Sequence, residues 1–290
     1  MTGNGTGDRT SGKRTGRWVD LAERLGSGLV ILILGVALLL APSPVAAMGI
    51  SVLYGALMWE LMRLTAPSAA PSSDQLPAPV PTARAAQGAL VVGVLGAVAM
   101  GLWLLRGGVF GLLPFAVMAL GLRFAAPALR PAYLGQALLT TLGAAGLGWI
   151  LGHDGLATAL WIVAVVVLSD VLGYFVGRSV GGPKFWPAIS PKKTWSGTVA
   201  GWVGAVALAL ALVTAGEAGW GALVAGPLLV FGGQLGDIAE SWLKRRARVK
   251  DSSQLIPGHG GLMDRFDAMG GSLAAALVMG LAGLLPTIGS

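Results

Sequence analysis

Residues 156–177 read LATALWIVAVVVLSDVLGYFVG, an apolar stretch in which Asp170 is the single charged residue. A helix of about 20 apolar residues is long enough to cross the hydrocarbon core of a bilayer. A carboxylate at that depth is costly unless it is paired or hydrated, so Asp170 is a functional candidate. A structural hydrogen bond or ion pair between helices is the alternative. The stretch therefore predicts a transmembrane helix that carries a carboxylate.

Similar apolar runs recur along the whole chain of 290 residues, of which 54% are hydrophobic and 11% charged. In soluble proteins roughly a quarter of the residues are charged. The lower fraction here leads us to expect an all-α, polytopic integral membrane protein. The chain has no cysteine, which excludes disulfides, thiolate metal sites and cysteine nucleophiles. The pattern predicts about nine spans, near residues 27–42, 45–62, 88–105, 108–124, 132–151, 156–177, 197–215, 220–240 and 270–287.

The distribution of positive charge predicts how these spans are oriented. With a cytoplasmic N-terminus, nineteen of the twenty Lys and Arg residues fall on the cytoplasmic side, and only Arg106 falls outside. Positive residues favour that side during insertion. The polar loops 178–196 and 241–269 are then both cytoplasmic. A net charge of +7 would suggest nucleic-acid binding in a soluble protein. Here the positive residues mark the cytoplasmic segments, so we expect no nucleic-acid partner.

Three regions are expected along the chain. Residues 1–24 form a basic, disordered cytoplasmic tail that lacks the features of a signal peptide. Residues 25–155 form N-terminal membrane helices, with a flexible Pro/Ala-rich linker at 66–86. Residues 156–290 form C-terminal membrane helices that carry the polar motifs.

Residues 241–267, SWLKRRARVKDSSQLIPGHGGLMDRFD, are a charged, glycine-punctuated segment between two apolar ones. At helical spacing one face carries two carboxylates, a hydroxyl and an ammonium, from Asp237, Glu240, Ser241 and Lys244. Asp264 and Asp267 repeat the spacing of three residues. Two carboxylate pairs beside a Gly-rich turn suit a divalent cation, since magnesium takes one or two carboxylates plus substrate phosphates and water. Salt bridges between helices are the alternative. His259 in the turn suits a proton donor, a phosphate contact or a plain loop residue.

The loop after Asp170 also suits phosphate binding. At helical spacing Asp170, Tyr174 and Arg178 share a face. Lys192 and Lys193 follow among Gly and Pro turns, which can hold ammonium and backbone N–H groups around phosphate oxygens. Ordinary cytoplasmic lysines beside an aromatic belt are the alternative. Together these segments predict a site at the cytoplasmic membrane surface, where a soluble nucleotide meets a lipid phosphate. Walker-type and dinucleotide glycine motifs are absent.

The spacing of these residues resembles the signature of the phosphatidate cytidylyltransferases (CDP-diglyceride synthetases) over roughly residues 160–285. The matching segments are Ser241-x-x-Lys244-Arg245, Lys250-Asp251, His259-Gly260-Gly261-x-x-Asp264-Arg265-x-Asp267, Asp170-x-x-x-Tyr174-Phe175-x-Gly177-Arg178, Ser190-Pro191-Lys192-Lys193-Thr194-Trp195-x-Gly197 and Gly236-Asp237-x-x-Glu240-Ser241. One departure is Ser196, where many members have Glu. In the first half the resemblance extends only to hydropathy and to the hairpin that ends in Glu60.

The resemblance implies the reaction of CTP with phosphatidic acid, giving CDP-diacylglycerol and pyrophosphate for phospholipid synthesis. It also implies Mg²⁺ dependence, with a second cation as an open alternative, a homodimer, and a multi-pass protein of the bacterial inner membrane whose active site faces the cytoplasm. The catalytic residues expected are Asp237, Asp264, Asp267, Lys244 and Lys193. The metal ligands expected are Asp237 and Asp264, with Glu240 and Asp267 as further ligands. The residues expected to bind substrate are Asp170, Tyr174, Arg178, Ser190, Lys192, Thr194, Ser241, Arg245, His259, Gly260, Gly261 and Arg265.

Two other functions compete with this interpretation. A related cytidylyltransferase with another lipid phosphate as acceptor would carry the same polar motifs, because acceptor choice depends on an apolar groove. A transporter would also contain polytopic helices and buried carboxylates, but transporters tend to show internal repeats and midplane polar residues. Neither feature is visible in this sequence.

Overall fold

The computed structural model describes residues 28–67, 82–255 and 260–289. Two compact units are present, Met1–Ala41 and Pro42–Ser290. In the first unit the described residues form a short apolar helix, Gly28–Leu40. The second unit contains α2 Ser43–Thr65, α3 Ala83–Arg106, η1 Gly108–Leu112, α4 Leu113–Gly121, η2 Pro127–Leu129, α5 Arg130–His153, α6 Gly155–Ser179, β1 Lys184–Trp186, β2 Ser190–Thr194, α7 Trp195–Thr214, α8 Ala222–Arg246 and α9 Met263–Leu281.

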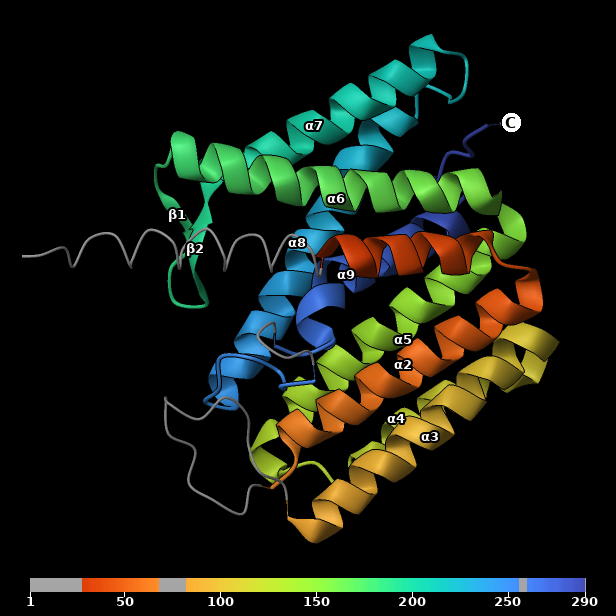
Figure 1. Cartoon of the computed structure of the whole chain (residues 1–290), viewed down its shortest axis with the longest axis vertical. Helices are drawn as coiled ribbons and strands as arrows, with labels where there is room; N and C mark the ends of the chain where they lie inside the picture. The colour runs from red at the N-terminus through yellow and green to blue at the C-terminus, as the bar shows by residue number, and fades with distance from the viewer. Residues whose placement is uncertain (1–27, 68–81, 256–259, 290) are drawn as a thin grey trace, which may run out of the picture. The chain divides into compact units, whose positions relative to one another are not determined.

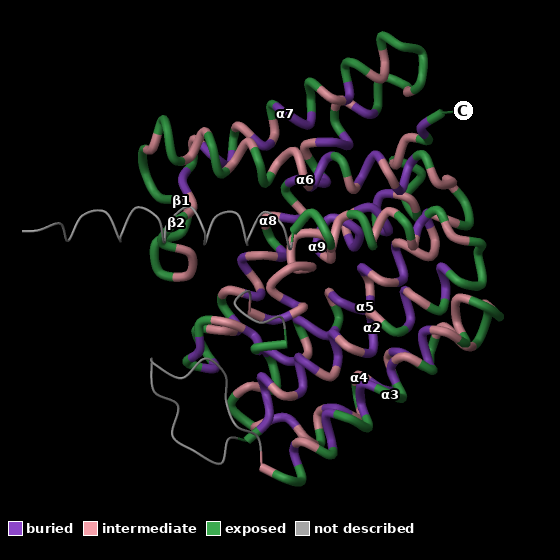
Figure 2. The backbone as a smooth tube through the Cα atoms, viewed as in Figure 1, coloured by how far each residue is buried: buried purple, intermediate pink, exposed green. Residues whose placement is uncertain are grey.

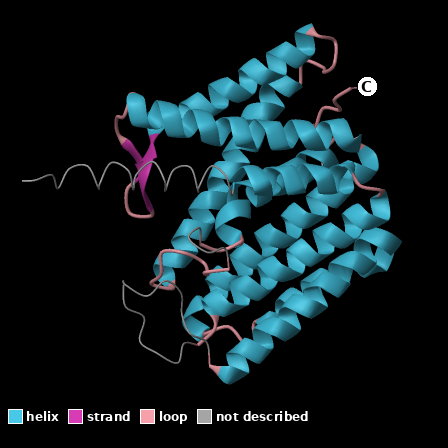
Figure 3. Ribbon diagram, viewed as in Figure 1, coloured by secondary structure: helices cyan, strands magenta, loops and turns pink. Residues whose placement is uncertain are grey.

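The described part of the chain is almost entirely helical, which confirms the all-α fold class (Figures 1 and 3). Six of its helices are long and apolar enough to cross a membrane: α2, α3, α5 with the preceding η2 turn, α6, α7 and α8. The protein is therefore a multi-pass membrane protein. The count of nine spans stays a prediction.

The predicted span at 108–124 differs most from the structure. This segment divides into η1 and the nine-residue α4. Gly107 and Gly108 have positive φ angles of 66° and 57°, so the chain turns sharply before η1. Nine helical residues extend about 14 Å, roughly half of a hydrocarbon core. The boundary before residue 108 was expected from the sequence, whereas the shortness of the helix that follows it was not.

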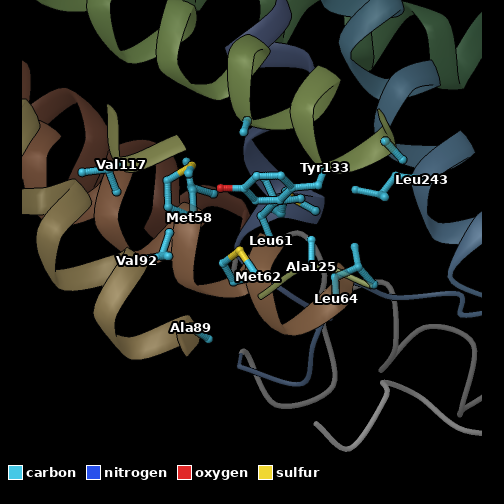
Figure 4. Close-up of a cluster of buried hydrophobic side chains, with 14 of the residues drawn as sticks. Met58, Leu61, Met62, Leu64, Ala89, Val92, Val117, Ala125, Tyr133 and Leu243 are labelled. Atoms are coloured by element: carbon cyan, nitrogen blue, oxygen red, sulfur yellow. The ribbon is translucent and has the colours of Figure 1, made fainter. Parts of the chain in front are cut away.

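The long helices of the second unit differ in how far they are buried. Half of the most apolar 18-residue window is buried in α2 and in α8, but only 28% in α6 and 33% in α7 (Figure 2). A core of large side chains joins α2 to its neighbours. In it Met58 and Leu61 of α2 pack with Tyr133 of α5 and Leu243 of α8 (Figure 4). This core joins α2 mainly to α3 and α5, with Leu243 of α8 at its edge.

Glycine residues let α8 and α9 pack closely. A Cβ atom at Gly271 would lie 3.0 Å from Gly236 Cα, and one at Gly232 would lie 2.6 Å from Ala275 Cβ. Small residues allow helix backbones in membrane proteins to approach in this way. Asp237 directly follows Gly236, and a Cβ atom at Gly236 would meet Asp267 O, so the crossing brings Asp237 of α8 near the start of α9 (Figure 1).

An antiparallel hairpin, β1–β2, occupies part of the segment expected as a loop (Figure 3). Lys184 pairs with Thr194, and Trp186 pairs with Ser190. The predicted linker at 66–86 falls largely on residues 68–81, which lie outside the described residues. Its last residues belong to α3, whose first turn is capped by the Thr82 hydroxyl.

Candidate functional site

Lys244 of α8 lies between two carboxylates from different helices. Its Nζ is 2.7 Å from Glu240 Oε2 and 2.5 Å from Asp264 Oδ1. The side chains of Lys244 and Asp264 are 13% exposed and that of Glu240 is fully buried. Pairing is what makes charges at this depth tolerable, since an unpaired buried charge is costly. The i,i+4 spacing on α8 was visible in the sequence, whereas the bond to α9 depends on the helix crossing.

The second oxygen of Asp264 is also occupied. Oδ2 accepts hydrogen bonds from Ser252 N at 2.9 Å, from the Ser252 hydroxyl at 2.8 Å and from Gly261 N at 2.8 Å. Burial alone would raise the pKa of Asp264, but the Lys244 ammonium and these donors outweigh it and lower the pKa. Asp264 is therefore held as a carboxylate.

Asp237 and Asp267 are neighbours across the α8–α9 crossing. Burial raises the pKa of Asp267, and the negative charge of Asp237 raises it further. Two carboxylates whose negative charges disfavour each other gain from a cation nearby. Asp237 has one cation already, since the Lys193 ammonium of β2 forms an ion pair with it. Ser241, one turn further along α8, donates a hydrogen bond of 3.2 Å to Asp237 Oδ1.

Asp170 completes this cluster from α6. The charges of Lys193 and Asp237 both act on it, although the residue itself is exposed. The site thus combines five carboxylates and two ammonium groups from α6, β2, α8 and α9: Asp170, Asp237, Glu240, Asp264, Asp267, Lys193 and Lys244. The excess of negative charge is suited to cations that arrive with a substrate.

The two neighbouring lysines of β2 have different surroundings. Successive side chains on a strand point to opposite faces. Lys193 reaches Asp237, while Lys192 is exposed. Thr194 is buried and caps α7 by accepting a hydrogen bond of 3.3 Å from Gly197 N. The hydroxyl of Ser196 donates to Gly181 O at 2.5 Å, so the residue that replaces the common Glu ties the first turn of α7 to the segment that follows α6.

The other predicted site residues have varied surroundings, and among them Gly260 lies beside Asp264, where a Cβ atom would be 2.9 Å from Oδ2. The Arg178 guanidinium donates a hydrogen bond of 2.8 Å to the Tyr174 hydroxyl, and both residues are exposed on α6. Ser190 is half-buried at the start of β2, and Arg245 is exposed in the last turn of α8. Arg265 is half-buried in the first turn of α9, and Gly260 has a φ of 81°. His259 lies outside the described residues.

The metal set expected from the sequence is not brought together as a whole. Among the described residues no three His, Asp or Glu side chains gather in a group that could hold a metal ion. The physical reason is that Lys244 engages both Glu240 and Asp264. Asp237, which pairs with Lys193, and Asp267, whose pKa the charge of Asp237 raises, are not bonded to Lys244. Because magnesium commonly uses one or two carboxylates with phosphates and water, these two aspartates fit an ion held jointly with a substrate.

Glu60 of α2 was not among the predicted site residues, yet its carboxylate contacts the signature loop, by which we mean the connection from the end of α8 to the first residue of α9. The residue is fully buried, and Oε2 accepts a hydrogen bond of 2.6 Å from Met263 N. A carboxylate inside an apolar run was the sequence signal, by the same reasoning that singled out Asp170.

Comparison with known proteins identifies the family of this chain. Residues 22–282 match the model of the Cytidylyltransferase family, which covers most of the chain. The chain belongs to this family.

Individual relatives of this family member are bacterial. Over 133 residues it is 47% identical to a phosphatidate cytidylyltransferase of Brucella abortus biovar 1 (strain 9-941), covering 45% of this chain and 48% of the relative. It is 43% identical over 126 residues to that of Bacillus subtilis (strain 168), covering 41% and 45%. For Staphylococcus aureus (strain COL) the identity is 36% over 137 residues, covering 45% and 53%. The matched region spans about half the length of these relatives.

Proposed function

We propose that this chain transfers the cytidylyl group of CTP to phosphatidic acid, giving CDP-diacylglycerol and pyrophosphate. The observation that carries the proposal is the meeting of three separated motif segments in one charged site. Lys193 of β2 pairs with Asp237 of α8, and Lys244 of α8 pairs with Asp264 of α9. Family membership and the printed names of the bacterial relatives support the choice of reaction.

The chemistry requires positioning and charge neutralisation more than acid–base catalysis. An oxygen of the lipid phosphate attacks the α-phosphorus of CTP and forms a new P–O bond. The bond from the α-phosphorus to the oxygen that bridges to the β-phosphorus breaks, and its electron pair leaves with pyrophosphate. The attacking oxygen is anionic at neutral pH, so no side chain has to remove a proton. As in other transfers at phosphorus, stabilising the charge on the phosphate oxygens lowers the barrier.

Lys193 and Lys244 are the side chains best placed for that role. Each ammonium is already held by carboxylates, so its direction is set before the nucleotide arrives. Arriving phosphates would share these ammonium groups with Asp237 and Asp264. A preorganised cation does not need to reorient during the reaction, which is the source of electrostatic catalysis.

We propose Asp237 and Asp267 as the residues that would hold Mg²⁺ together with substrate phosphates. The negative charge of Asp237 acts on Asp267, while Glu240 and Asp264 are bonded to Lys244. The ion would supply positive charge to the triphosphate. Asp264 was expected from the sequence as a metal ligand. We propose instead that it orients Lys244.

We also propose that the site faces the cytoplasm of a bacterial cell, at the surface of the inner membrane. CTP is soluble and approaches from water, whereas phosphatidic acid enters from the bilayer. The charged ends of α6, α8 and α9 suit such a meeting point, because the remainder of α6 and α8 is apolar. A homodimer stays a prediction.

The test is pyrophosphate release by detergent-purified protein, with CTP, phosphatidic acid and Mg²⁺ omitted one at a time. Release that needs all three, and that ATP does not support in place of CTP, is the expected result. Release with an ether or isoprenoid lipid phosphate but not with phosphatidic acid would show that the acceptor is that other lipid phosphate. Folded protein that shows no release with any lipid phosphate would overturn the proposed function.

A further inference from the structure

Glu60 belongs to the half of the chain that lacks the signature, yet it has several contacts with the signature loop. Besides Met263 N, its carboxylate accepts a hydrogen bond from Leu262 N at 3.2 Å through Oε1. The Ser252 hydroxyl lies 3.2 Å from the same oxygen. All of these donors are about 200 residues away along the sequence. The reaction proposed above assigns no role to this carboxylate.

The contacts of Glu60 lie at the start of α9. Leu262 is the N-cap of that helix and Met263 is its first residue. Backbone N–H groups at a helix start have no partner within the helix, and an acidic side chain there stabilises the helix terminus. The N-cap residue Leu262 makes no side-chain capping hydrogen bond of its own. Glu60 therefore supplies from α2 a cap that the N-cap residue lacks, directly before Asp264.

Ser252 links Glu60 to Asp264. Its hydroxyl is 3.2 Å from Glu60 Oε1 and 2.8 Å from Asp264 Oδ2, so its single proton lies between two carboxylates. Gly261 fills the remaining space, because a Cβ atom there would collide with Glu60 Oε1 and the Ser252 hydroxyl. The four residues form one compact hydrogen-bonded unit. A shift of Glu60 would therefore be transmitted to Asp264.

Glu60 is also carried on a rigid support. Its helical neighbours Met58, Leu61 and Met62 are fully buried in the core that includes Tyr133 and Leu243 (Figure 4). Packed helices hold functional groups more accurately than loops do. The start of α9, which Glu60 contacts, is thus connected through α2 to the core of the bundle.

We propose that Glu60 is a positioning residue for cytidylyl transfer. It fixes the start of α9 and, through Ser252, directs the Asp264 carboxylate at Lys244. The inference rests on the proposed function, since the direction of Lys244 affects turnover only if this site reacts. Misplacement of a reacting group by about 1 Å can cost about 100-fold in rate.

The experiment uses the purified full chain and the variants Glu60→Gln, Ser252→Ala and their combination. Gln keeps the shape of the side chain but has no charge, and its NH2 group would face a backbone donor. We expect Glu60→Gln to lower kcat by about 10–100-fold while KM for CTP changes by less than about threefold. Hydrogen exchange of the peptide that contains residues 260–264 should become faster.

Thr65→Val is the matched control for stability. Thr65 is buried in the same helix, and its hydroxyl donates to Leu61 O at 2.8 Å, away from the loop. This variant should lower Tm without lowering kcat of the folded enzyme or changing exchange at residues 260–264. The two variants are compared at the same loss of Tm. If Thr65→Val then loses as much kcat as Glu60→Gln, the role of Glu60 is structural and the positioning role is refuted.

The combined variant tests the path through Ser252. If both residues act through one linked unit, its kcat should be no lower than that of Glu60→Gln alone. Losses that multiply would overturn the link. If Glu60→Gln does not fold, Glu60→Asp keeps the charge but withdraws it by one methylene, and the same loss of kcat is expected.

The outcomes separate this inference from the proposed function. Wild-type protein without turnover overturns the reaction and with it the catalytic effect of Glu60, whereas the exchange measurement still reports whether Glu60 holds the loop. An active wild type with an equally active, equally protected Glu60→Gln variant overturns the positioning role alone.

Discussion

Lys244→Met tests how the buried charges of this protein are balanced. Methionine has nearly the same length as lysine, but it leaves Glu240 and Asp264 without their shared cation. The three side chains are 13%, 0% and 13% exposed, so water cannot replace the ammonium. Removing one partner of a buried ion pair costs about 3–5 kcal/mol. At about 2 °C per kcal/mol for a large domain, Tm should fall by roughly 6–10 °C.

Thermal unfolding of detergent-purified protein, followed by intrinsic tryptophan fluorescence, measures this shift. Lys250→Met is the control, because Lys250 is exposed and its loss should leave Tm almost unchanged. Adding Glu240→Gln to Lys244→Met removes one of the unpaired charges, so part of the lost stability should return. A Tm of Lys244→Met equal to that of the control would refute the view that Lys244 neutralises these carboxylates.

Three further predictions concern the same site. Gly261→Ala should lower Tm and reduce turnover at least about 10-fold, because its Cβ atom has no space; normal activity would show that the loop tolerates displacement. Lys193→Ala should reduce kcat at least about 10-fold more than Lys192→Ala, since only Lys193 pairs with Asp237; equal losses in a steady-state assay would contradict the distinction between them. Asp267→Asn should raise the Mg²⁺ concentration needed for half-maximal turnover by about 10-fold or more, and an unchanged metal titration would remove Asp267 from the metal site.

Much of the fold followed from the sequence by local rules. Apolar runs predicted the helices because the backbone of a membrane span must satisfy its hydrogen bonds internally. The spacing of Glu240 and Lys244 predicted their contact, since residues four apart share a helix face. The β1–β2 hairpin was missed because Lys, Pro and Trp residues with two turns resemble a loop when no cross-strand partner is known.

The site was predicted less completely, for a different reason. Asp264 was expected as a metal ligand, yet in the structure it accepts hydrogen bonds from Lys244, Ser252 and Gly261. A carboxylate has the same composition in either role, and its partner depends on which side chain the helix crossing brings near. The same holds for the two lysines of β2, which differ only in the face of the strand they occupy.

The sequence by itself determined that the chain is a helical membrane protein with one concentrated set of carboxylates, lysines and glycines. These properties depend on composition and on spacings of a few residues, which the helix geometry converts directly into neighbours. The tertiary structure alone decided which charges pair across helices and that Glu60 holds the start of α9, about 200 residues away. Such contacts depend on how closely helices approach, and at the α8–α9 crossing the small residues Gly232, Gly236 and Gly271 set that distance.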